Sequence, residues 1–341
     1  MALSETLDHA AERRQERDRP ADDGRRARWR AARAHMERSG RKHTPFGSRR
    51  SYRRQLEPLY AACGVGLKIV GLHRPGVANA LDIGLSELAF GFADLPPAFD
   101  GLRILHLTDL HLDGLPDLDR TLARIVADTA PDVAVFTGDY LWEVGGAFAH
   151  VLPGLARIVE AARPSLAALA TLGNHDPHGI VEPLEGLGLR VLINETMTLE
   201  RQGQRLLVSG LDDVSSFYTE EAVRALRQTP PGFKLALVHS PELAPEAAAA
   251  GYRLYLCGHT HGGQVCLPNG RPIATGTTNT PRSRTRGPWR IGEMVGYTGR
   301  GAGTSRLPVR FFSRGEVTLI TLRRAAPDGS AAEGRDQLDM G

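Results

Sequence analysis

Histidine, aspartate and asparagine residues recur directly after short apolar stretches of this sequence. They are Asp109, His111, Asp139, Asn174, His175, Asp176, His239, His259 and His261. Residues two apart in an extended chain point to the same side, so Asp109 and His111 can reach one ion, and His259 and His261 repeat this spacing. Imidazoles, carboxylates and an amide oxygen together suit borderline divalent cations such as Mn²⁺, Zn²⁺, Fe or Co²⁺.

The number of these donors predicts more than one ion. A single ion that leaves room for substrate takes fewer protein ligands, so we expect two ions that share a bridging carboxylate. Such a pair holds a bridging hydroxide near neutral pH and stabilises the oxygens of a phosphoryl group during in-line displacement. The predicted reaction is therefore hydrolysis of a P–O bond. Isolated histidines such as His106, His150 and His178 are interpreted as surface or core residues.

The elements that must position these side chains follow a regular pattern. Apolar strand candidates cover residues 103–109, 132–138, 165–173, 190–194, 205–210, 234–240 and 253–259. Amphipathic helical stretches cover residues 118–130, 151–162, 219–228 and 241–250. This alternation predicts an α/β protein with much parallel sheet, in which ligands bind at the carboxyl ends of the strands. After a loop-like stretch, residues 289–298, 308–312 and 316–322 are expected to form an antiparallel sheet.

Charge and composition indicate a globular domain with a basic extension. Residues 1–54 hold 16 Arg and Lys against 8 Asp and Glu, a net +8 in a chain of net +3, so the other residues carry about −5. We expect residues 1–58 to be a solvated arm, helical or flexible, and residues 59–100 to pack as a lead-in. The domain that carries the candidate metal ligands is expected over 101–324, with a disordered tail over 325–341.

The N-terminal part also bears on localisation. The stretch SRRSYRR (48–54) resembles a twin-arginine export signal and precedes a 14-residue apolar run, 59–72, that is too short to span a bilayer. We favour a core element or a membrane-surface contact over export, in a cytoplasmic protein. Association of the basic arm with a membrane surface is the alternative to a solvated arm. Three scattered cysteines, Cys63, Cys257 and Cys266, suggest no disulfide framework. No obligate protein partner is predicted.

Five blocks of this sequence carry a family resemblance. They are TDLH (108–111), GDY (138–140), GNHD (173–176), VHSP (238–241) and GHTH (258–261). Together they resemble the calcineurin-like metallophosphoesterase superfamily, and the ending GHTHGGQVCLP resembles one bacterial branch of it. The resemblance covers residues 100–322. It implies a four-layer αββα sandwich with a dinuclear metal site between two central sheets.

The resemblance also implies roles for individual residues. One ion would be held by Asp109, His111 and His261 and the other by Asn174, His239 and His259, with Asp139 bridging them. His175 would protonate the leaving group as general acid, and Asp176 would orient its ring.

Substrate contacts and function leave alternatives open. The guanidinium groups of Arg282, Arg284 and Arg286 suit a non-reacting phosphate, although this stretch also fits a solvated loop. The residues Tyr140, Leu141 and Trp142 would line a cleft for a bulky or lipid-linked group, or belong to the core. The predicted function is a metal-dependent phosphoesterase, most simply a phosphodiesterase. A catalytically silent phosphate-binding scaffold and a nuclease recruited by the basic arm are the alternatives.

Overall fold

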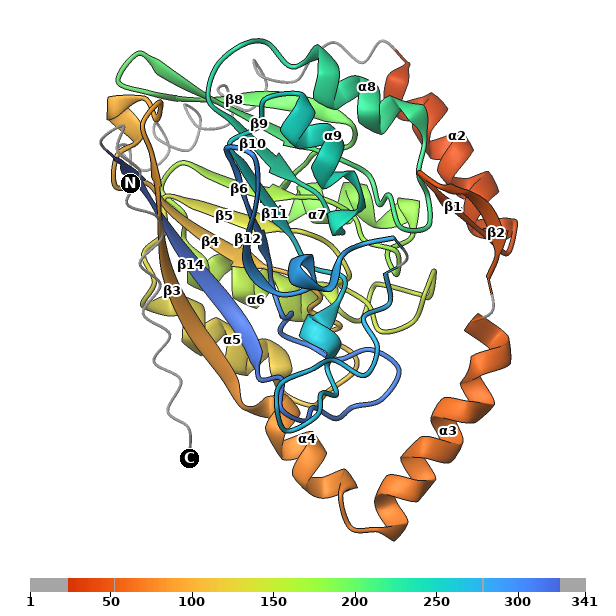
Figure 1. Cartoon of the computed structure of the whole chain (residues 1–341). Coiled ribbons are helices and arrows are strands. Elements are labelled where there is room, and N and C mark those ends of the chain that lie inside the picture. The colour runs from red at the N-terminus through yellow and green to blue at the C-terminus, as the bar shows by residue number, and fades with distance from the viewer. Residues whose placement is uncertain (1–23, 52, 278, 326–341) are drawn as a thin grey trace, which may run out of the picture.

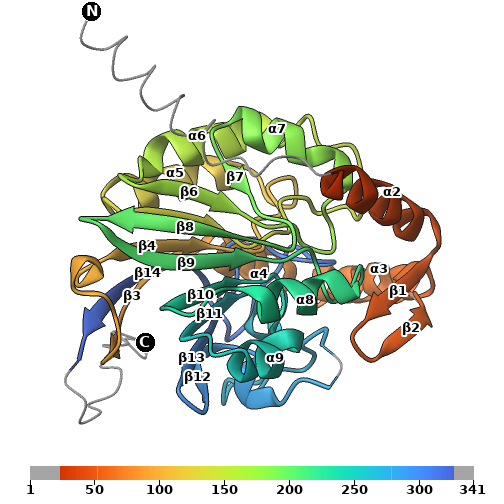
Figure 2. The same ribbon diagram turned by 90° about the horizontal axis from the view of Figure 1, so that it is seen from above.

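Two six-stranded sheets packed face to face form the centre of the molecule. The structure is a computed structural model that describes residues 24–51, 53–277 and 279–325. Helices cover the outer face of each sheet, so the layers run helix, sheet, sheet, helix (Figures 1 and 2). The predicted four-layer α/β sandwich is confirmed.

The first sheet has the strand order β3-β14-β4-β5-β6-β7. These strands are β3 (Ile83–Phe92), β14 (Gly315–Arg324), β4 (Arg103–Leu107), β5 (Val133–Phe136), β6 (Ala167–Ala170) and β7 (Arg190–Val191). All neighbours pair in parallel except β14 and β4. Its outer face carries the helices α5 (Leu118–Ala127), α6 (Leu152–Ala162) and α7 (Val181–Gly186).

The second sheet has the order β12-β13-β11-β10-β9-β8. Its strands are β12 (Gly287–Ile291), β13 (Met294–Thr298), β11 (Leu254–Cys257), β10 (Lys234–Leu237), β9 (Gln204–Gly210) and β8 (Glu195–Arg201). The outer helices are α8 (Glu220–Gln228) and α9 (Ala244–Ala249). Short 3₁₀ turns lie at Pro97–Phe99, His178–Ile180, Pro241–Leu243, His261–Gly263 and Arg282–Arg284.

Apolar side chains fill the three spaces between the four layers. Between the sheets, Ile104 and Val133 of one sheet belong to the same buried cluster as Leu235 and Leu256 of the other. Under α5, the buried stripe Leu118, Leu122 and Val126 follows the spacing of a helix face that packs on a sheet. Packed apolar side chains thus hold the strands in place up to their ends, and the polar residues follow directly after those ends.

The C-terminal strands differ from the expectation of one antiparallel sheet. Strands β12 and β13 form a hairpin in the second sheet, whereas β14 crosses to the first sheet and lies between β3 and β4. Residues 308–312 form no strand. There the buried Arg310 donates hydrogen bonds to the carbonyls of Arg300, Gly301 and Gly303, which hold the segment as a folded loop.

The basic N-terminal extension packs on the sandwich. It contains α2 (Arg25–Arg38), the hairpin β1 (Arg41–Thr44) and β2 (Gly47–Arg50), α3 (Arg53–Ile69) and α4 (His73–Leu81). The expected solvated arm is therefore wrong for α2, because Arg33 and Met36 are buried. The helix packs because its arginines pair with carboxylates of the sandwich. The pairs are Arg25 with Glu195, Arg26 with Glu185, and Arg30 with Glu182. The first 23 residues and the tail from residue 326 lie outside the described part.

Of the two alternatives for the apolar run 59–72, the core element is wrong, and the membrane-surface contact stays a prediction. Its side chains lie on α3 and the turn after it, and Leu59 and Ile69 are 57% and 79% exposed. No helix in the described parts of the chain is both long and apolar enough to cross a membrane.

Candidate metal centre

The polar residues predicted to bind metal follow strands of both sheets at their carboxyl ends. Asp109 and His111 follow β4, Asp139 follows β5, and Asn174 with His175 follows β6. His239 follows β10 of the second sheet, and His259 and His261 follow β11. Most of these side chains are buried. The candidate donors of the two sheets therefore lie close together.

Left-handed backbone conformations mark the same residues. Asp109, His111, Asp139, His259 and His261 have φ values of 51°, 40°, 59°, 70° and 51°. Each such conformation costs roughly 1–3 kcal/mol in a residue with a Cβ, and it persists where the surroundings impose it. Five strained residues at one point indicate a functional site.

Glycines at this point give the ligands their space. A Cβ on Gly258 would lie 2.0 Å from the Thr108 hydroxyl oxygen and 2.2 Å from an oxygen of the Asp109 carboxylate. On Gly138 it would lie 2.2 Å from the backbone nitrogen of Gly173. The glycines that precede Asp139 and His259 are therefore required by close approach.

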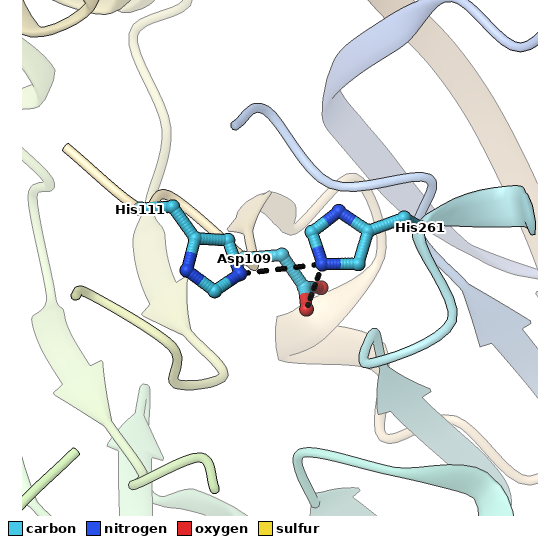
Figure 3. A group of neighbouring side chains, drawn as sticks. All are labelled: Asp109, His111 and His261. Carbon is cyan, nitrogen blue, oxygen red and sulfur yellow. Dashed lines mark hydrogen bonds and ion pairs between the residues drawn. The ribbon is translucent and has the colours of Figure 1, made fainter. Parts of the chain in front are cut away.

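Asp109, His111 and His261 form the first group of donors (Figure 3). The Nε2 atoms of His111 and His261 are 3.2 Å apart, and His261 Nε2 is 3.4 Å from Asp109 Oδ1. His111 Nδ1 lies 2.5 Å from the carbonyl oxygen of Leu141, so it carries the proton and Nε2 keeps its lone pair. Lone pairs of three buried side chains thus meet in one space, which suits a divalent cation.

Asp139, His239 and His259 form a second group, with Asn174 beside it. His239 Nε2 is 3.3 Å from Asp139 Oδ2, 3.3 Å from the Asn174 amide oxygen and 3.2 Å from His259 Nδ1. Asp139 Oδ2 is also 3.6 Å from His111 Nε2. Its carboxylate therefore lies between the two groups, and all seven predicted ligands are together.

Sequence comparison identifies the family. A family model described as calcineurin-like phosphoesterase matches residues 102–263. The uncharacterised metallophosphoesterase YkuE of Bacillus subtilis is 30% identical over 288 residues, which cover 80% of this chain and 98% of that protein. The chain belongs to the calcineurin-like phosphoesterase family. The superfamily predicted from the five motif blocks is confirmed, and this phosphoesterase is a metal-dependent hydrolase.

Two further relatives have more specific names. The phosphodiesterase YaeI of Escherichia coli is 29% identical over 231 residues, which cover 64% of this chain and 82% of that protein. The UDP-2,3-diacylglucosamine pyrophosphatase LpxG of Chlamydia muridarum is 30% identical over 173 residues, or 48% of this chain and 50% of that protein. The phosphoesterase is similar to both.

Electrostatics of the buried cluster favour cation binding. Burial raises the pKa of Asp109. Burial acts in the same direction on Asp139, but the charges of His239 and its neighbours outweigh it and hold the pKa of Asp139 well below its usual range. Burial lowers the pKa of His261, and so does the nearby His111. The Asp139 carboxylate is thus ionised and can bind a cation, while His261 stays neutral and can donate a lone pair.

The GNHD loop of the phosphoesterase is held differently from the prediction. His175 Nδ1 lies 2.6 Å from the Trp142 carbonyl oxygen, which fixes the ring. The Asp176 carboxylate accepts hydrogen bonds from the backbone N–H groups of Gly173, Asp139 and Tyr140 at 2.7, 2.7 and 2.8 Å. Asp176 therefore orients the backbone of the site rather than the His175 ring. Burial and the charge of Asp139 raise the pKa of Asp176 to about 7.

The basic extension supplies a support for this loop that the motifs did not reveal. Arg33 of α2 donates to the carbonyls of Gly173 and Asp176 at 3.1 and 2.7 Å, and pairs with the buried Asp212. Four residues later, Glu37 accepts from the backbone N–H of His178 at 2.8 Å. The sequence signal for this support is weak. Trp29, Arg33 and Met36 have the spacing of one helix face, but the middle residue, Arg33, is charged and so does not suggest a buried face.

The remaining predicted substrate residues are scattered around the site. Arg284 lies 6.0 Å from the Trp289 ring, and Arg282 and Arg286 are exposed. Their segment is tied to the site, because the Thr260 hydroxyl donates to the Thr285 carbonyl at 2.5 Å. Tyr140 is buried and donates to the Thr171 carbonyl, so it is a core residue rather than a cleft wall. Trp142 is half-buried, and its ring lies 6.5 Å from that of His111.

Proposed function

We propose that this phosphoesterase is a dinuclear phosphodiesterase that hydrolyses a P–O bond. One observation carries the proposal: the Asp139 carboxylate lies between two groups of buried donors, as a bridging ligand must. The name of the relative YaeI supports the choice of a diester substrate.

The residues of the two groups fit two cations. Asp109, His111 and His261 would hold one ion, and Asn174, His239 and His259 the other, with Asp139 shared. Mixed nitrogen and oxygen donors suit Mn²⁺, Zn²⁺, Fe or Co²⁺. When bound, such ions polarise a phosphoryl group and lower the pKa of a water that attacks phosphorus.

His175 is the proton donor in this proposal. Its Nδ1 is held by the Trp142 carbonyl, so the opposite nitrogen, Nε2, points into the site and lies 3.9 Å from Asp139 Oδ2. The leaving alkoxide needs a proton, and an imidazole whose ordinary pKa is about 6.5 can donate one from Nε2. His175 is 7% exposed, so bulk water competes little for that proton.

A lipid-linked phosphate ester is the substrate class that we favour. The name of the relative LpxG, a UDP-2,3-diacylglucosamine pyrophosphatase, supports an acylated substrate, although a pyrophosphatase cleaves a P–O–P anhydride rather than an ester. Beside His111, the half-buried Trp142 offers apolar surface to a bulky substituent. Arg282, Arg284 and Arg286 would contact a non-reacting phosphate from the segment tied to Thr260.

Hydrolysis of bis(p-nitrophenyl) phosphate and p-nitrophenyl phosphate by the full chain with Mn²⁺ tests the activity. Asp139→Asn should abolish turnover and lower the metal content from two ions per chain, measured by elemental analysis. His175→Ala should lower kcat by about 100-fold and keep the metals. The exposed His150, which pairs with Asp113, provides the control His150→Gln. Full activity in excess chelator, or loss of the metals in His175→Ala, would contradict the proposal.

The two alternatives receive less support. A silent scaffold has no need for the strained ligand backbone or for His175. The nuclease alternative needs free cations on the basic arm, but four arginines of α2 pair with carboxylates of the chain, as Arg26 does with Glu185 and Arg33 with Asp212. DNA binding that falls steeply with salt would be required to revive it.

A further inference from the structure

An unusual apolar surface covers α3 and its flanking turns. Large apolar side chains between 38% and 79% exposed are concentrated here: Phe46, Leu56, Leu59, Val65, Ile69, Val70 and Leu72. Fewer are found in the rest of the described chain: Leu85, Val144 and Leu166 lie on separate elements, and Leu267, Ile273 and Phe312 lie on loop segments that pair with one another. Clustered exposure of this kind marks an interaction surface. We call the first set the α3 surface.

Helix α3 is held to the sandwich along only one stripe. The guanidinium carbon of Arg306 lies 4.9 Å from the centre of the Tyr60 ring, and one turn later a Cβ on Gly64 would lie 3.6 Å from Leu307. Val65 and Ile69 lie on the opposite side of the helix. In Figure 1 α3 stands apart from the layers of the sandwich. These contacts thus fix the direction of the helix, and they leave the α3 surface exposed to solvent.

The charges around this surface are almost all positive. Residues 41–74 contain eight Arg and Lys, and Glu57 is their one acidic residue. A second copy of the chain would bring the same cations against them, whereas an anionic lipid surface would attract them. The helix has 17 residues, or about 25 Å, which is shorter than the ~30 Å hydrocarbon core of a bilayer. An apolar helix of this length with basic flanks suits the plane of the interface.

We propose that the α3 surface docks on an anionic lipid bilayer. The docked helix lies in the interface, with Leu59, Val65 and Ile69 among the acyl chains and the exposed arginines of the β1–β2 hairpin at the headgroups. Phe46, at the turn of that hairpin, is 56% exposed and enters with them. No other part of the chain needs to enter the bilayer.

Docking at this surface places the metal centre beside the membrane. The segment under α3 is bound to Gln264, which donates to the carbonyls of Ser305 and Leu307 at 3.1 and 2.9 Å. Gln264 follows the ligand His261 by three residues. For the reaction, this inference rests on the proposed function: an amphiphilic phosphate ester could reach the site while its acyl chains stay in the bilayer. The docking itself requires no catalysis.

Co-sedimentation of the full chain with vesicles tests the docking. Vesicles of phosphatidylcholine alone are compared with vesicles that contain phosphatidylglycerol. The variant Leu59→Glu, Val65→Glu, Ile69→Glu changes exposed residues only, so the fold is kept, and the control Leu166→Glu changes an exposed leucine elsewhere. Each buried apolar side chain contributes about fivefold to partitioning, so we expect roughly a hundredfold weaker binding for the triple variant. The control should bind as the wild type does.

Each outcome decides for or against the docking. Binding that needs the anionic lipid, weakens with salt and is lost in the triple variant supports it. Equal binding of both vesicle types, or wild-type binding by the triple variant, overturns it. Self-association that the triple variant abolishes, without lipid binding, assigns the surface to a second copy instead. Hydrolysis of bis(p-nitrophenyl) phosphate should be equal in all three proteins, which separates failure of docking from failure of the proposed reaction.

Discussion

Replacement of Arg33 by methionine tests whether α2 belongs to the catalytic unit. The guanidinium of Arg33 is fully buried and joins three parts of the phosphoesterase: Asp212 and the carbonyls of Gly173 and Asp176. Those two carbonyls flank Asn174 and His175, the predicted ligand and proton donor. Methionine keeps most of the side-chain volume and removes every hydrogen bond.

The expected loss of stability is large. Removal of one partner from a buried ion pair costs about 3–5 kcal/mol, because the other charge stays buried without compensation. Here burial already raises the pKa of Asp212, so in the variant this carboxyl can take up a proton, which limits the cost. Trp29 Nε1 still donates to Asp212 at 2.7 Å. We therefore expect about 3 kcal/mol less free energy of unfolding, a substantial part of the ~5–15 kcal/mol typical of a domain.

The double variant Arg33→Met, Asp212→Asn separates stability from positioning. It removes the uncompensated carboxylate and still leaves the two carbonyls of the loop without their donor. We expect urea unfolding to recover about half of the lost free energy. The kcat for bis(p-nitrophenyl) phosphate should remain about tenfold or more below wild type with KM little changed, because His175 is displaced while the rest of the site is kept.

Arg30→Met is the matched control. Arg30 lies one turn earlier on α2 and pairs with Glu182, but both side chains are exposed, so the pair contributes at most about 1 kcal/mol. Wild-type kcat in the double variant would refute the positioning role of Arg33. So would an equal loss of kcat in Arg30→Met, because the effect would then belong to the helix as a whole.

Three further predictions concern the walls of the site and the core. Arg310→Met should lower the free energy of unfolding in urea by about 3–5 kcal/mol, because five carbonyls lose their hydrogen-bond donor. The control Arg314→Met removes an exposed ion pair and should lower it by less than ~1 kcal/mol. Gly258→Ala should lower the metal content measured by elemental analysis, because its Cβ meets the Asp109 carboxylate, whereas Gly186→Ala, with open space around it, should not. Burial lowers the pKa of His106 to about 4, so below pH 6.5 only the unfolded chain takes up this proton and stability falls as the pH drops towards 4. His106→Gln should remove roughly 3 kcal/mol of that loss, and parallel stability curves for both proteins between pH 7 and 4.5 would contradict it.

The strand ends that carry the candidate ligands could be predicted, because a short apolar run followed by polar residues marks the end of a strand. Asp109, Asp139 and His239 each follow an apolar run that became a strand, and parallel strands bring their carboxyl ends to one edge. The same rule identified all seven strands proposed between residues 103 and 259. Strands β3 and β8 were missed, because their alternating pattern is interrupted by polar residues on a half-buried face. Sheet membership of β14 was also missed, since pairing between distant strands leaves no local signal.

The N-terminal extension was misjudged for a different reason. Its charge was interpreted as a sign of solvation, since arginine-rich stretches without apolar periodicity rarely pack. The carboxylates that neutralise it are Glu182, Glu185, Glu195 and Asp212, more than 140 residues away in the chain. Charge complementarity over such a distance cannot be seen in one sequence. A charged run can therefore be an interior contact when its counter-charges lie on another element.

These contacts place the extension on two sides of the metal centre. Helix α2 holds the GNHD loop through Arg33. Helix α4 holds residues 309–310, because the Arg310 N–H donates to the Gly76 carbonyl at 2.9 Å and a Cβ on Gly76 would meet Val309. Arg310 in turn donates to the carbonyl of the ligand His261 at 3.2 Å. The backbone strain at the ligands must be offset by surrounding contacts, and these are among the nearest. Residues 24–81 therefore stabilise the geometry of the site as well as extending the fold, which explains why a basic segment without any catalytic motif packs so closely on a phosphoesterase domain.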